Sequence, residues 1–83
     1  MTKVVDLDKS WKNVVEIGFS GLIQNTGSRD LIIFIGEPNS ERGHKLPSNE
    51  FMRFEKTSRR IYAKASSTIG EIAITADDTD DEQ

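Results

Sequence analysis

The fold class is decided by the stretch Gly21-Leu22-Ile23-Gln24-Asn25-Thr26-Gly27-Ser28-Arg29-Asp30-Leu31-Ile32-Ile33-Phe34-Ile35-Gly36. Two apolar runs, residues 21–24 and 31–35, flank a polar segment at 25–28 whose residues suit a chain reversal. This pattern predicts a β-hairpin, and with it a small all-β protein. The run 31–35 is apolar at every position, so we expect one face of that strand to cover the core and the other to need a partner.

Alternation of apolar and polar side chains predicts the remaining strands. They are residues 4–7 (a short strand or an ordered arm), 14–19, 51–55, 61–65 and 71–75. The last two are expected to form a closing hairpin. No segment carries the 3.6-residue apolar stripe of a helix, and strands recur every ~8–12 residues. The expected fold is therefore a compact antiparallel β-sandwich or barrel of about six to seven short strands.

The chain of 83 residues is expected to form one domain with two simple ends. We expect an N-terminal arm or short strand in residues 1–10, the β-sandwich in 11–76 and an acidic, disordered tail in 77–83. Five of the 14 acidic residues lie in that tail, so residues 1–76 carry nine acidic against 11 basic residues. A core this small is thin, and without cysteine it has no disulfide to reinforce it, which makes self-association the expected support.

Composition also restricts the function. No run approaches the ~20 apolar residues of a membrane span, and the N-terminus lacks the apolar core of a signal peptide, so a soluble, non-secreted protein is expected. The single histidine, His44, lies in a polar loop beside Glu41 and Arg42, where a solvated side chain is the ordinary interpretation. The acidic tail lacks the glycine and ligand spacing of a calcium loop. We therefore expect no catalytic residues, no cofactor and no metal site.

Two sets of residues are candidates for contact with partners. The apolar and aromatic set could form an interface: Trp11, Ile32, Phe34, Phe51 and Tyr62. The basic set could form a positively charged patch: Arg53, Lys56, Arg59, Arg60 and Lys64. A nucleic-acid surface needs aromatic and basic side chains on one open face, whereas Phe51 and Tyr62 are expected on separate strands, so nucleic acid is not the expected partner.

The order of these segments resembles a family of small β-sandwich virion proteins of tailed bacteriophages, of the head decoration or head-fibre type. The matching pieces, spread over about residues 11–76, are Ile23-Gln24-Asn25-Thr26-Gly27, Leu31 to Ile35, Gly36-Glu37-Pro38, Leu46-Pro47-Ser48-Asn49-Glu50, Ile61-Tyr62-Ala63-Lys64-Ala65 and Glu71-Ile72-Ala73-Ile74-Thr75. One departure is the turn at 46–50, which lacks the glycine that usually precedes the glutamate.

The resemblance implies a non-enzymatic structural protein of the virion, present in the host cytoplasm during assembly. Its implied partners are copies of itself, as a trimer or a pentamer, and other virion proteins such as the major capsid protein. Two alternatives stay open: a tail, neck or fibre-tip component that binds a carbohydrate or protein receptor, and a nucleic-acid accessory protein. Head, neck and tail positions are not distinguished by the sequence.

Overall fold

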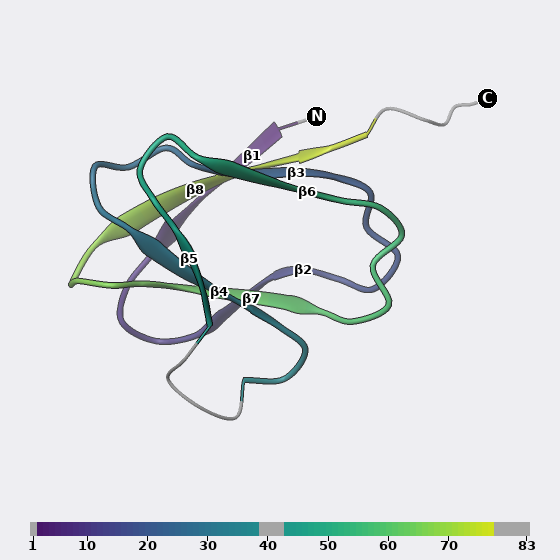
Figure 1. Ribbon diagram of the computed structural model, residues 1–83, viewed down its shortest axis with the longest axis horizontal. Helices are drawn as coiled ribbons and strands as arrows, with labels where there is room; N and C mark the ends of the chain where they lie inside the picture. Colours follow the sequence, from purple (N-terminus) through teal and green to yellow (C-terminus); the bar gives the residue numbers. More distant parts are fainter. Residues whose placement is uncertain (1, 39–42, 78–83) are drawn as a thin grey trace.

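The computed structural model describes residues 2–38 and 43–77, which form eight strands in two antiparallel sheets of four. Figure 1 shows the sheets as two layers, with β1, β8, β3 and β6 in one and β2, β7, β4 and β5 in the other. The predicted all-β sandwich is thus confirmed, with more strands than expected. Their bounds are β1 Thr2–Leu7, β2 Lys12–Val15, β3 Gly21–Asn25, β4 Leu31–Ile35, β5 His44–Leu46, β6 Phe51–Phe54, β7 Ile61–Ala65 and β8 Gly70–Ala76.

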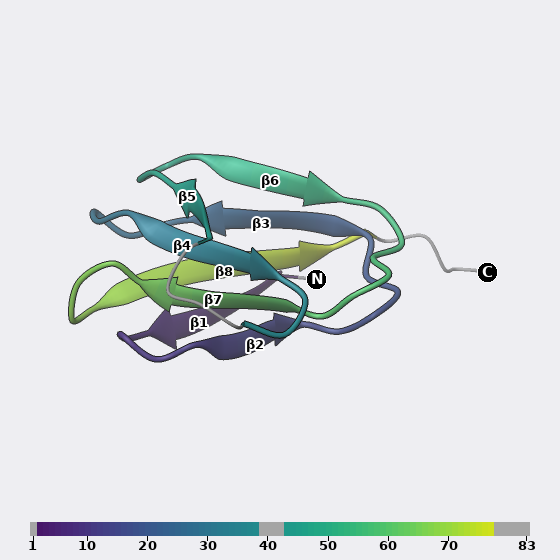
Figure 2. The same ribbon diagram turned by 60° about the horizontal axis from the view of Figure 1, so that its bottom comes forward.

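The strand order is that of a jelly roll, the eight-stranded double sheet built from two Greek keys. β1 pairs with β8, β2 with β7, β3 with β6, and β4 with β5, as if one long antiparallel ribbon had been rolled around itself. Two further pairings, β3 with β8 and β4 with β7, complete the two four-stranded sheets. Figure 2 shows β1 and β2 together at one edge of the sandwich and β6 at the opposite edge.

Both predicted hairpins are wrong in their pairing. β3 belongs to the sheet β1-β8-β3-β6 and β4 to the sheet β2-β7-β4-β5, so residues 26–30 connect one sheet to the other rather than two neighbouring strands of one sheet. β7 and β8, predicted to close the domain as a hairpin, are separated in the same way. Turn residues show where the chain reverses, and they do not show whether it returns beside itself or in the opposite layer.

The core lies between the two layers and follows the predicted alternation. In β7, Ile61, Ala63 and Ala65 are buried, and in β8 Ile72 and Ile74 are buried. These residues recur at every second position, as in the predicted alternation, and so do Met52 and Phe54, which are half-buried against the core. The remaining buried apolar side chains are those of Leu7, Val14, Val15, Ile23, Leu31, Ile33 and Leu46.

The strand predicted at 14–19 is misplaced. β2 covers Lys12–Val15, and its register with β7 shifts between Asn13 and Val15, so one extra residue is inserted there. A bulge of this kind disrupts simple alternation, and it explains why Val14 and Val15 are both buried. Ile17, which the predicted strand included, lies beyond the end of β2 and is 62% exposed.

Both ends of the described chain are held by the sheet β1-β8-β3-β6. Residues Thr2–Leu7 form a full edge strand, each paired with a residue of β8. At the other end, Asp77 belongs to the folded part: its N–H donates to the carbonyl of Ser20 (2.8 Å) and its carboxylate accepts from Arg53 (2.7 Å). The rest of the predicted disordered tail, 78–83, lies outside the described residues.

No helix in the part of the chain that the structure describes is long and apolar enough to cross a membrane.

Candidate interaction surface

The outer face of the sheet β2-β7-β4-β5 gathers most of the predicted interface residues; we call it the aromatic face. Tyr62 of β7 lies directly opposite Phe34 of β4 and Asn13 of β2, and Lys64 lies opposite Ile32. Their neighbours along the strands, such as Ile33 and Ala63, are fully buried in the core. Because successive side chains point to opposite faces of a sheet, these residues point outward. The aromatic face consists of Trp11, Asn13, Ile32, Phe34, Tyr62 and Lys64.

Trp11, just before β2, contacts Phe34 of β4 and Lys64 of β7 on this face. Its ring contacts the ring of Phe34 edge to face, with centroids 5.6 Å apart and planes at 77°. Nζ of Lys64 lies 5.0 Å from the centroid of the Trp11 ring, and Lys64 is only 8% exposed. An ammonium over an indole ring is attracted by the ring's negative face. The chain thus covers part of the apolar strand β4 with its own tryptophan, while Ile32, Phe34 and Tyr62 stay half-buried.

A polar network borders one end of the aromatic face. The hydroxyl of Tyr62 donates to the carboxylate of Glu37 (2.9 Å), and Nε of Arg60 donates to Glu16 (2.9 Å). Arg60 also lies 3.9 Å from Glu37, and the amide of Asn13 donates to Glu16. The hydrogen bond from Arg60, followed by the one from Asn13, lowers the pKa of Glu16. Five side chains from three separate segments, 13–16, 37 and 60–62, therefore hold one another in place around this rim.

The same network changes the pKa of Tyr62, the single tyrosine of the chain. The hydrogen bond to Glu37, then burial and the charge of Glu37, raise the pKa of Tyr62. A raised folded-state pKa means that the bond's contribution to stability is complete below the ordinary tyrosine pKa and is lost as pH rises through the folded value. We expect ultraviolet titration of tyrosinate to give a pKa above the ordinary one, and Glu37→Gln to lower it. Glu71→Gln, on the other sheet, serves as the control, and an equal shift in both variants would contradict the assignment.

Four of the five predicted interface residues thus come together, and the fifth does not. Phe51 lies on β6, opposite Gln24 of β3, on the outer face of the other sheet, where it is 60% exposed. Nothing in the alternation of 51–55 distinguishes the two outer faces, because that depends on which sheet the strand joins. The rim residues Glu16 and Glu37 were missed, since their partner Arg60 is distant in the sequence and no local pattern marks such pairs.

The predicted basic patch is dispersed. Arg53 lies on the outer face of the sheet β1-β8-β3-β6, bound to Asp77, whereas Lys64 lies on the opposite outer face against Trp11. Arg60 is held by carboxylates of the rim. Lys56 and Arg59 are exposed in the connection between β6 and β7. The five cations therefore do not form one positive surface.

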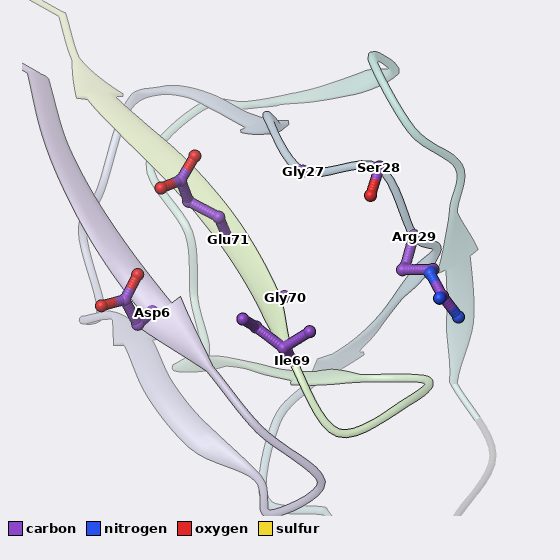
Figure 3. Close-up of a pocket in the computed structure, with 7 residues that line it drawn as sticks. All are labelled: Asp6, Gly27, Ser28, Arg29, Ile69, Gly70 and Glu71. Carbon is purple, nitrogen blue, oxygen red and sulfur yellow. The ribbon is translucent and has the colours of Figure 1, made fainter.

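A shallow hollow of about 240 Å³ lies at the end of β1 and β8, shown in Figure 3. Asp6 and Glu71, direct partners across the two strands, place their carboxylates on one side of it, and Ile69 also lines it. The guanidinium of Arg29 points away from both carboxylates. Within residues 2–38 and 43–77, no group of three or more His, Asp or Glu side chains is placed to hold a metal ion.

The single histidine lies in an edge strand of the sheet β2-β7-β4-β5. His44 is the first residue of β5, opposite Ile33, and is exposed.

Comparison with known proteins gives no assignment: no protein-family model, no curated protein and no solved structure matches this chain.

Proposed function

We propose that the protein is a non-enzymatic structural subunit of a tailed-phage virion, of the head decoration or accessory type, which binds the shell through its aromatic face. The observation that carries the proposal is the convergence of Trp11, Ile32, Phe34 and Tyr62 on one outer face of a sheet. The solvent-exposed face of an antiparallel sheet ordinarily carries polar residues. Apolar side chains at these positions favour a surface that a partner covers.

Aromatic side chains with polar residues at their border are typical of protein–protein interfaces. Tryptophan and tyrosine are the residue types that most often dominate binding energy, and a surrounding polar rim excludes water from them. Here the rim is formed by Glu16, Glu37 and Arg60, which are tied together before any partner arrives. Side chains that are already ordered lose less entropy on binding. The jelly roll itself occurs in viral capsid proteins and in lectins, which supports the proposal by analogy only.

Such a subunit acts by mass action. A module that binds only the assembled shell stabilises it by RT ln(1 + [L]/Kd) at each site, so occupancy of many equivalent sites makes the particle more resistant to disassembly by heat.

The test compares two phenylalanines on opposite faces of the sandwich. Phe34→Ser is expected to weaken co-sedimentation with particles of the encoding phage by more than about tenfold, because it removes the ring against Trp11. Phe51→Ser makes the same change on the other sheet and is expected to leave binding unchanged. Circular dichroism of both variants checks that they fold. Equal binding by both variants, or absence of binding by the unaltered protein, would refute the proposal.

A second candidate is recognition of a receptor glycan by a tail or fibre component. It is favoured by one observation: Phe34 and Tyr62 lie beside the carboxylate of Glu37 and the guanidinium of Arg60, so apolar rings and hydrogen-bonding groups share one surface. Binding of the pure protein to a glycan array, lost in Glu37→Gln, would support this function in place of shell binding.

A further inference from the structure

β1 is the longest and most regular of the four edge strands. β5 has three residues, β6 has four, and β2 has a break in register, whereas Thr2–Leu7 pairs with β8 at every position. Proteins usually protect sheet edges by short strands, bulges or proline, because an open edge can pair with another strand. β1 contains no proline and no bulge, and Figure 2 shows it at the margin of its sheet.

The backbone groups that face the open side of β1 can be assigned. The carbonyl of Glu71 accepts from the N–H of Thr26, so Glu71 directs its backbone groups toward β3 and away from β1. Its direct partner Asp6 must then form a pair without mutual hydrogen bonds, with its own N–H and C=O toward the open edge. Nζ of Lys12 donates to the Asp6 carbonyl (3.1 Å), which independently places that oxygen on the open side. By alternation, the backbone groups of Thr2 and Val4 face the same way.

We propose that β1 pairs antiparallel with β1 of a second copy of this chain, centred on Val4, so that the two four-stranded sheets become one continuous sheet. A twofold axis perpendicular to the sheet keeps the outer faces on one side, so outward residues meet outward residues. Val4 then lies opposite Val4 of the second copy, and Thr2 lies opposite its Asp6. In this register both the N–H and the C=O of all three edge-facing residues find partners, and the Asp6 carbonyl, which also accepts from Lys12, uses its second lone pair.

The side chains support the same register. Val4 is 57% exposed in the single subunit, although it lies in the middle of a regular strand, and the pairing covers it with an identical valine. Asp6 meets a threonine and Lys3 meets Val5, so no like charges are opposed. A register centred on Asp6 would instead place two carboxylates opposite each other.

This pairing is separate from shell binding. The aromatic face lies on the outer side of the other sheet, so a pair of subunits leaves both aromatic faces open. The contact is small compared with the ~1,200–2,000 Å² of a stable interface. It is therefore expected as a reversible dimer that forms at high concentration, and on a lattice that holds subunits side by side.

Sedimentation equilibrium up to millimolar concentration tests the proposal with three variants. Val4→Pro removes an edge-facing N–H, which an edge strand tolerates because the fold does not use it, and is expected to weaken dimerisation by more than about tenfold. Val4→Ala keeps the N–H and is expected to have a smaller effect. Phe51→Pro makes the same kind of change on the open side of β6 and is expected to leave the dimer unchanged. The carbonyl of Glu50 accepts from the N–H of Asn25 in β3, so the backbone groups of the next residue, Phe51, point away from β3.

Amide hydrogen exchange provides a residue-level readout of the same contact. At high concentration the amides of Val4 and Asp6 should become protected, while those of Lys3 and Val5, which face β8, are protected at every concentration. A monomer at all concentrations would overturn the proposal. So would a dimer in which the Val4 amide still exchanges freely, or one that Val4→Pro leaves intact. Particle binding by Phe34→Ser is measured separately, so failure of either proposal can be recognised on its own.

Discussion

Asn25→Asp is expected to unfold the protein or to lower its stability by about 3–5 kcal/mol, the cost of an unpaired buried charge. Asn25 is completely buried at the end of β3. Its Nδ2 donates to the carbonyls of Arg29 (2.7 Å) and Leu46 (2.9 Å), and its Oδ1 accepts from the N–H of Gly27 (2.9 Å). A carboxylate keeps only the last of these bonds and turns an oxygen toward two carbonyl oxygens. Small domains are stable by only ~5–15 kcal/mol in total, so the loss is severe.

The neighbouring residue provides the matched control. Gln24→Glu makes the same chemical change one position earlier on β3, where the side chain is exposed, and is expected to alter the free energy of unfolding by less than about 0.5 kcal/mol. Urea unfolding followed by the fluorescence of Trp11, the single tryptophan, measures both. Similar midpoints for the two variants would contradict the role assigned to the Asn25 amide.

Acid should partly rescue the Asn25→Asp variant. Burial against carbonyl oxygens raises the pKa of the introduced carboxyl in the folded state, so its destabilising effect is fully present at neutral pH and decreases as pH falls through that raised value. A protonated carboxyl can donate to one of the two carbonyls. The difference in stability from the unaltered protein is therefore expected to be smallest near the ordinary aspartate pKa, about 4, and below.

Strand positions and faces could be predicted because alternation is a local property. In Ile61–Ala65 the buried residues Ile61, Ala63 and Ala65 and the outward Tyr62 follow directly from the period of two. The bulge in β2 shows where this reasoning ends. One inserted residue buries both Val14 and Val15, and nothing in the sequence marks the insertion.

Strand pairing could not be predicted, because it depends on distant segments. Asn25 was interpreted as a residue of a polar hairpin turn, since asparagine is common in turns. Its side chain instead binds the backbone of Leu46, 21 positions away, and helps carry the chain from one layer to the other. The misjudged pairing also explains the dispersed basic residues: Arg53 and Lys64 are close in sequence, but β6 and β7 belong to different sheets.

Gly21→Ala is the other substitution expected to have a large effect, at about 3 kcal/mol or more. Gly21 lies at the start of β3 with a φ of +153°, opposite Ala76 of β8. A Cβ built on this residue would lie 2.1 Å from the carbonyl oxygen of Thr75 and 2.9 Å from Cα of Ala76. Both contacts are with backbone, which cannot rotate away as a side chain could. β8 would have to move away from β3. Because β8 also pairs with β1, the strain would reach β1 as well.

Gly18→Ala separates this clash from the cost of backbone conformation. Gly18 also has a positive φ, +90°, yet a Cβ there would meet no atom within 4 Å. Its substitution is therefore expected to cost only the ~1–2 kcal/mol of placing an L-residue in left-handed backbone. Thermal and urea unfolding of the two variants measure the difference. If Gly21→Ala is no less stable than Gly18→Ala, then β3 and β8 separate without cost at this end, and the close approach of their backbones does not contribute to the stability of the fold.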